Sequence, residues 1–164
     1  MLVLGGALAI IVGGYFAYET RVVAVTNFMG LKLPDTKADI KFKKGIAQHE
    51  SEALWGFRDK DGKWESLVRF RNEKVRWIVY IGDCTYCNSL NGLGIGTSYE
   101  ELINKLGTPT QVSPSGDGLK RLVSFAKTNQ FFQLERGRVF GFGIYDPASG
   151  PIEYLKGEQE RLAD

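Results

Sequence analysis

The chain has 164 residues, of which 43% are apolar and 24% are charged, and it includes ten Phe, seven Tyr and three Trp. This balance excludes a disordered or low-complexity chain and fits one domain with a small appendage. The net charge of +2, from 21 basic and 19 acidic residues, gives no electrostatic case for a nucleic-acid partner. One His and two Cys leave little material for a metal site or histidine-based catalysis. This composition does not exclude an enzyme but places one at a disadvantage, and we expect no enzyme, no cofactor, no metal and no small-molecule substrate.

The first segment, Met1–Tyr18, contains no Asp, Glu, Lys, Arg or His. As a helix it would be roughly 27 Å long, close to the thickness of a bilayer core. Tyr15, Phe16 and Tyr18 gather at one end, as in an aromatic belt at the lipid surface. The segment predicts an uncleaved single-span anchor. A cleaved signal peptide is the alternative, but no charged region precedes the apolar run and no clear cleavage site follows it.

Small residues recur at every fourth position of this segment, at Gly5, Ala9, Gly13 and Ala17. On a helix they form one shallow stripe that lets a second helix approach closely. We expect this stripe to bind a helix of a larger membrane protein. The alternative is a chance alignment, because Gly and Ala are common in membrane spans.

The charges after the anchor bear on its orientation. Arg21, Lys32 and Lys37 follow the apolar run closely, and this positive bias alone would place the rest of the chain in the cytoplasm. A cysteine pair and the family resemblance described below favour export instead. We expect an inner-membrane protein with a periplasmic domain, and the cytoplasmic orientation remains the alternative.

The rest of the chain predicts an α+β domain that is mainly antiparallel β. We divide the chain into an anchor (1–26), a connector (27–38), the domain (39–147) and a polar tail (148–164). Short β-favouring runs separated by turn residues predict two groups of strands. The runs are Ala53–Phe57, Lys63–Phe70 and Lys74–Ile81, then Leu119–Ala126, Asn129–Glu135 and Arg138–Tyr145.

One short helix is sharply indicated. Ser98 and Glu101 form an S-x-x-E capping box, and an apolar stripe follows at Leu102, Ile103 and Leu106. Gly107 suits the position after the helix, and Pro109 prevents its continuation.

This helix and the strands after it resemble a known group of proteins. The run G-I-G-T-S-Y-E-E-L (94–102), closed by L-G-T-P (106–109), is similar to a motif of small exported bacterial domains. These are the BamE/OmlA (SmpA) type and the β-lactamase-inhibitor-protein-like type, and the turn Arg136–Val139 resembles their hairpin. The match covers about Gly92 to Tyr145 and implies a protein-binding fold with no catalytic residues to transfer. The chain lacks their lipidated Cys near the anchor, so their outer-membrane location does not carry over. Glu73–Val75 repeats the hairpin pattern, which suggests a degenerate copy of the unit upstream.

Cys84 and Cys87 form a C-x-x-C pair just after a predicted strand. In an oxidising compartment such a pair predicts a local disulfide. A redox-active pair would need the first Cys at a helix start, but the turn-like sequence N-S-L-N-G (88–92) follows. Zinc would need two further ligands, and among soft ligands only His49 is available. His49 itself is expected to be a solvated surface residue.

A basic run surrounds the predicted turn between the second and third strands. Arg69, Arg71, Lys74 and Arg76 are candidates for one basic contact face, which would meet anionic lipid headgroups or an acidic partner. The alternative is a solvated face balanced by Glu65 and Glu73.

These features together predict a non-catalytic accessory subunit that binds a larger membrane protein complex. The candidate contact residues of its domain are Trp55, Trp64, Phe140 and Phe142. Gly141 and Gly143 leave one face of their strand bare, where a partner or a packed helix could lie. The alternatives are a free-standing envelope assembly or inhibitor-type binding module, and a thiol–disulfide protein using the cysteine pair.

Overall fold

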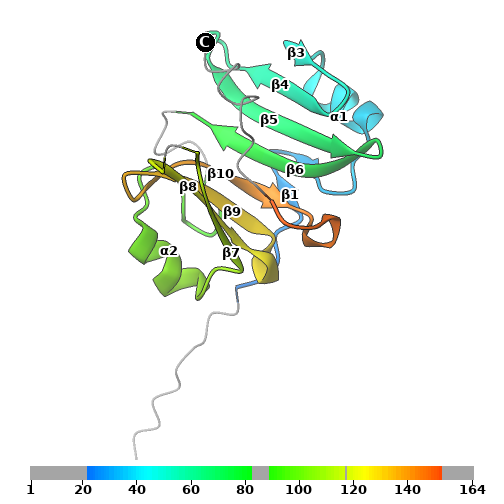
Figure 1. Cartoon of the computed structure of the whole chain (residues 1–164). Coiled ribbons are helices and arrows are strands. Elements are labelled where there is room, and N and C mark those ends of the chain that lie inside the picture. The colour runs from blue at the N-terminus through cyan, green and yellow to red at the C-terminus, as the bar shows by residue number, and fades with distance from the viewer. Residues whose placement is uncertain (1–21, 83–88, 117, 153–164) are drawn as a thin grey trace, which may run out of the picture.

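The structure, a computed structural model, describes residues 22–82, 89–116 and 118–152 (Figure 1). This part of the chain is α+β, with two short helices and an eight-stranded antiparallel sheet, which confirms the predicted class. The expected anchor Met1–Tyr18, its small-residue stripe and the Cys84–Cys87 pair lie outside the described residues. Within the described ranges, no helix is long and apolar enough to span a membrane.

The sheet has the order β3-β4-β5-β6-β10-β9-β8-β7. Six strands confirm the predictions within about one residue, and two of them match at both ends. The strands are β3 His49–Glu50, β4 Leu54–Arg58, β5 Trp64–Arg71, β6 Lys74–Ile81, β7 Gln111–Pro114, β8 Lys120–Phe125, β9 Gln130–Glu135 and β10 Arg138–Tyr145. The predicted helix is α2, Tyr99–Leu106, with Ser98 as its N-cap. Short 3-10 turns occupy Ala126–Thr128 (η1) and Pro147–Ser149 (η2).

The expectation of a single helix is wrong, because a second helix, α1, spans Lys37–Lys44. Its capping box is a T-x-x-D variant made by Thr36 and Asp39, and Ile40 is its one buried side chain. A lysine-rich helix with one buried residue shows little apolar periodicity, so the pattern does not reveal it.

The segment expected to be a connector contributes to the folded core. Two short strands, β1 (Asn27–Phe28) and β2 (Leu31–Lys32), form a hairpin there. Phe28, Leu31 and Leu33 are all buried against the sheet. Residues 22–26, which we assigned to the anchor, contain no helix.

The two halves of the domain, α1 with β3–β6 and α2 with β7–β10, have matching backbone geometry. In the first half, Lys37 N donates to Glu73 O (3.3 Å) and Val75 N donates to Asp35 O (2.8 Å). The second half repeats both hydrogen bonds, from Tyr99 N to Gly137 O (3.0 Å) and from Val139 N to Thr97 O (2.9 Å). Each helix is thus tied to the turn of the last hairpin of its own half, which supports the suggested degenerate repeat.

The halves join where β6 pairs with β10, and Val79 opposite Gly143 is the middle one of the five residue pairs. A Cβ atom on Gly143 would lie 1.9 Å from the carbonyl oxygen of Ile78 and 2.8 Å from the Cα of Val79. We predicted a bare strand face at Gly143 that a partner or a helix could cover. Backbone atoms of the neighbouring strand β6 occupy the space beside it instead. Glycine at this position permits the close approach of the two central strands.

Both helices cover the same face of the sheet, since Ile40 of α1 and Leu102 of α2 belong to one apolar cluster. At its centre, the ring of Phe142 lies 5.6 Å from that of Phe28, 5.5 Å from that of Tyr80 and 6.4 Å from that of Phe132. A smaller cluster fills the opposite face. It includes Leu54, Leu67, Trp77, Val79, Leu122, Phe131, Tyr145 and Ile152.

The two capping boxes make helix stability depend on pH. In each box the carboxylate accepts a hydrogen bond from the N-cap backbone, from Thr36 N to Asp39 and from Ser98 N to Glu101. These backbone hydrogen bonds, and then the hydroxyl groups of Thr36 and Ser98, lower the pKa of both carboxyls below their ordinary values of 3.8 and 4.5. Each ionised carboxylate therefore stabilises the folded state fully when the pH is above its ordinary pKa. This stabilisation is lost as the pH falls through the lowered pKa of the folded state.

We expect the Tm of the protein to fall on acidification through this range. The variant Asp39→Asn/Glu101→Gln keeps hydrogen-bond acceptors at both positions without titrating groups. Its Tm, followed by circular dichroism between neutral pH and pH 3, should fall less steeply than that of the wild type. An equal slope for both proteins would show that the boxes contribute nothing to the acid response.

Candidate functional site

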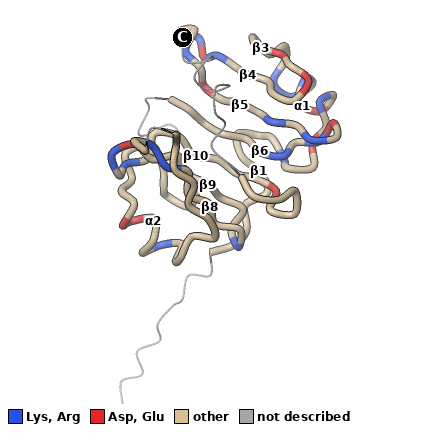
Figure 2. The backbone as a smooth tube through the Cα atoms, viewed as in Figure 1, with Lys and Arg blue, Asp and Glu red and all other residues tan. Residues whose placement is uncertain are grey.

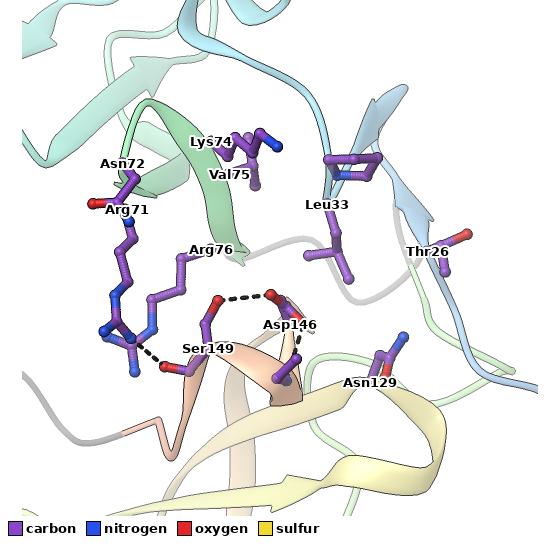
Figure 3. A pocket seen from close by; sticks show the side chains of 12 residues that line it. Thr26, Leu33, Arg71, Asn72, Lys74, Val75, Arg76, Asn129, Asp146 and Ser149 are labelled. Carbon is purple, nitrogen blue, oxygen red and sulfur yellow. Dashed lines mark hydrogen bonds between the residues drawn. The ribbon is translucent and has the colours of Figure 1, made fainter.

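An open cleft of about 700 Å³ lies beside the β5–β6 turn, between it and the segment that follows β10 (Figure 3). Its walls come from four separate parts of the chain, which are the N-terminal segment, the β5–β6 hairpin, the residue after η1 and the η2 turn. The lining residues are Thr26, Leu33, Pro34, Arg71, Asn72, Lys74, Val75, Arg76, Asn129, Asp146, Ala148 and Ser149.

Two arginines of the hairpin hold the segment after β10 in place. Arg71 Nη1 donates to the carbonyl oxygen of Ser149 at 2.6 Å, and Arg76 Nη2 donates to that of Pro151 at 2.6 Å. The backbone N of Asp146 also donates to Arg76 O at 2.8 Å. These bonds orient both guanidinium groups. The Arg71 guanidinium has five N–H donors, so its bond to Ser149 O leaves further donors for another acceptor.

Asp146 is the one carboxylate among the described residues that line the cleft. Its oxygens accept hydrogen bonds from Ala148 N (3.0 Å) and from Ser149 Oγ (2.6 Å), so the carboxylate serves as the cap of η2. Three cations line the same cleft, from Arg71, Lys74 and Arg76. No described carboxylate lies within ion-pair distance of Lys74. The arrangement suits an anionic ligand.

The structure brings three of the four residues of the predicted basic face together in this cleft, while Arg69 is not among the lining residues. The balancing carboxylates are placed separately. Glu73 pairs with Lys37 at 2.8 Å, and Glu65 pairs with Lys44 at 3.7 Å.

Sequence reasoning missed the second wall of the cleft. Asp146 followed by Pro147 is the pattern of an N-cap with Pro at the first helical position, and it could have identified the η2 turn. Nothing in the local sequence shows that this turn lies against Arg71, which is 78 residues away from Ser149.

The cleft and the N-terminal segment lie at the same end of the central strands. Thr26 lines the cleft, and Val25 N donates to Thr128 O just before β9 begins. Because β6 and β10 are antiparallel, the β5–β6 and β9–β10 turns lie at opposite ends of this pair (Figure 1). From the strand register we estimate that the two turns are about 30 Å apart.

The β9–β10 turn is also basic (Figure 2), but its residues differ from those of the cleft. The strand register aligns the two hairpins residue by residue. Glu135 corresponds to Arg71, and Phe140 corresponds to Arg76, each of the latter two being the unpaired residue of a β-bulge. Arg138 donates to Gly96 O at 3.0 Å, next to its own helix. The arginine pair therefore belongs to one half alone, the half whose hairpin contacts the segment after β10.

The predicted aromatic contact residues divide into two groups. Trp55 and Phe142 are buried core residues, with 7% and 0% of their surface exposed, so they offer little area for contact with a partner. Trp64 and Phe140 are half-buried, and each lies under a cation, Arg58 at 4.1 Å and Lys120 at 5.4 Å respectively.

His49 is half-buried, and its ring packs edge-on against Trp64 at 6.5 Å. In the parts of the chain that the structure describes, no group of three or more His, Cys, Asp or Glu could hold a metal ion.

No protein-family model matches the chain, and no curated protein matches its sequence. Its fold is similar to that of a DUF4309 family protein, YjgB, from Bacillus subtilis. The TM-score is 0.51 at 12% identity, over 72% of this chain and 83% of that one.

Two further structures match with lower TM-scores. A cysteine-rich secretory protein from Staphylococcus aureus has a TM-score of 0.49 at 14% identity, over 78% of this chain and 48% of its own. An extracellular protein containing a SCP domain from Bacillus anthracis has a TM-score of 0.47 at 13% identity, over 89% of this chain and 56% of its own. This chain thus spans about half the length of these two proteins. None of the three structures is described as a BamE/OmlA-type domain, so that resemblance stays a prediction.

Proposed function

We propose that this chain is a non-catalytic accessory subunit of a larger bacterial membrane protein complex. The Met1–Tyr18 helix anchors it in the inner membrane and packs against a partner helix through the stripe Gly5, Ala9, Gly13 and Ala17. The α+β domain then lies in the periplasm, with the end that carries the basic cleft towards the membrane.

The observation that carries this proposal is the position of the cleft relative to the N-terminal segment. Thr26 forms part of the cleft wall and follows Tyr18, the last residue of the apolar run, by eight residues. Eight residues span at most about 28 Å, so the anchor keeps the cleft close to the bilayer and to any protein that the helix binds.

The asymmetry of the two halves supports a docking role for this end of the domain. The arginine pair that orients the cleft is absent from the other half, where Glu135 and Phe140 take the corresponding positions. Complementary charge across an interface steers association and fixes its orientation, so a cluster of cations confined to one end of the domain fits a docking role for that end.

Co-purification in a gentle detergent tests the proposal. We expect the tagged wild-type chain to retain a stoichiometric membrane protein complex, identified by mass spectrometry, and Gly5→Leu/Gly13→Leu to lose it because bulky side chains fill the stripe. Ala7→Leu/Ile11→Leu, on the opposite face of the same helix, is the matched control and should retain the complex. Recovery of the chain alone in all three samples would contradict the proposal and favour a free-standing envelope binding module.

A further inference from the structure

We infer that the cleft binds the phosphate of an anionic phospholipid headgroup at the surface of the membrane that holds the anchor. This inference rests on the proposed function, because it uses the anchor to bring the domain to the bilayer. It assigns a ligand to the basic end of the domain, in addition to any protein that the helix binds.

The chemistry of the cleft fits a phosphodiester. Arg71 and Arg76 come from one hairpin and are held by the carbonyl oxygens of Ser149 and Pro151, so their guanidinium groups are oriented in advance. Lys74 lies between them in the sequence, is exposed, and has no described carboxylate within ion-pair distance. Guanidinium and ammonium groups form short, charge-assisted hydrogen bonds to phosphate oxygens, and Asn72 and Asn129 add neutral amide donors at the rim.

The carboxylate of the cleft does not oppose such a ligand strongly. Asp146 directs its oxygens to Ala148 N and Ser149 Oγ within its own turn. The described lining residues carry three cations against this one carboxylate. The volume of about 700 Å³ is large enough for a glycerophosphate headgroup, and the cleft is open enough for it to enter from a membrane surface.

The anchor favours a lipid over a soluble ligand as the source of the phosphate. A group tethered within about 28 Å of a bilayer meets headgroups at a high effective concentration. Anionic headgroups additionally attract basic segments near the surface. A soluble phosphate or an acidic peptide has no comparable advantage on the structure described.

Native mass spectrometry of the full chain in mild detergent tests this inference, with phosphatidylglycerol and phosphatidylcholine of identical acyl chains as probes. We expect phosphatidylglycerol to bind about tenfold more tightly than phosphatidylcholine. Arg71→Gln/Lys74→Gln should remove most of this preference, while Arg76 still donates to Pro151 O and holds the segment after β10. Lys74→Gln alone changes an exposed side chain and should weaken binding without affecting folding.

The matched control is Arg136→Gln/Arg138→Gln, which removes the same charge from the other hairpin. It should leave the preference within about twofold of the wild type, because neither substitution lies in the cleft. Both double variants lose two positive charges and therefore the same general electrostatic attraction, so a larger loss in the first reports the contacts of the cleft itself. Equal loss in both variants, or no preference in the wild type, would overturn the inference. Displacement of the lipid by an equal concentration of free glycerol phosphate would assign the site to a soluble phosphate, and tighter binding of a glutamate-rich peptide would assign it to a protein.

Failure of this inference is distinguishable from failure of the proposed function. A chain that is extracted from membranes by alkaline carbonate has no anchor, which contradicts the proposed function. A chain that stays in the membrane and retains its complex, but shows no lipid preference, contradicts this inference alone.

Discussion

Gly143→Ala is expected to destabilise the protein by about 3 kcal/mol or more and to lower its Tm by about 10 °C. The added methyl group would lie 1.9 Å from Ile78 O and 2.8 Å from the Cα of Val79, both of them backbone atoms of the adjacent central strand. A backbone contact cannot be relieved by rotating a side chain, so β6 and β10 would have to separate at the junction of the two halves. Thermal unfolding of the full chain in detergent, followed by near-ultraviolet circular dichroism, measures the effect.

Gly141→Ala provides the matched control on the same strand and the same face. Its methyl group would meet Gln133 Oε1 at 2.7 Å and Ile81 Cγ2 at 3.3 Å, which are side-chain atoms that can move. We expect a cost of about 1 kcal/mol. Equal Tm values for Gly143→Ala and the wild type would show that the close approach of the central strands is not a requirement of the fold.

Phe142→Ala is expected to cost about 3–5 kcal/mol, because it removes a fully buried ring and leaves a cavity in the larger core cluster. Its ring lies within 6.4 Å of those of Phe28, Tyr80 and Phe132, which come from three different strands. The same substitution therefore weakens the N-terminal hairpin and the contact between the two halves. Chemical denaturation of the detergent-solubilised chain gives the free energy of unfolding.

Phe140→Ala, two residues earlier on the same strand, separates a packing role from a contact role. Phe140 is half-buried at the bulge of β10 and lies under Lys120. We expect its loss to cost below about 1 kcal/mol. A cost similar to that of Phe142→Ala would contradict the assignment of Phe142 to the core and of Phe140 to the rim.

The central strands could be predicted closely because β-favouring apolar runs are bounded by turn residues. In Lys74–Ile81 the run from Trp77 to Ile81 is continuously apolar and begins just after a turn, and the S-x-x-E box marks the start of α2. The bulge at Arg76 was not predicted, and it places Val75 in the larger cluster while Trp77 and Val79 lie in the smaller one. The pairing of β6 with β10 could not be predicted, because an apolar run indicates a buried strand and does not identify its neighbour.

The elements that were missed are short or weakly patterned. β1, β2 and β3 have two residues each, which is below the length at which alternation can be recognised. α1 was not predicted because its four lysines leave little apolar periodicity. Its capping box, made by Thr36 and Asp39, nevertheless has the same spacing as that of Ser98 and Glu101. A search for a second copy of the capped helix, at the distance that separates the two hairpins, would have found it.

The basic half of the candidate site could be predicted because its cations lie close together in the sequence. The rest depends on contacts between distant segments, such as Arg76 with Pro151, which are 75 residues apart. A pattern of charges predicts a basic hairpin, and a cleft arises when the fold brings a second wall against it.

The account depends most on one claim, that the end of the domain with the cleft faces the membrane. A photo-crosslinking amino acid placed at Asn72, on the exposed rim of the cleft, tests it in intact cells. The same group at Arg136 is the matched control, since it occupies the corresponding place in the other hairpin, about 30 Å away. We expect adducts with membrane lipid or membrane protein from position 72 and none from position 136. Equal yields from both positions, or adducts from position 136 alone, would contradict the account.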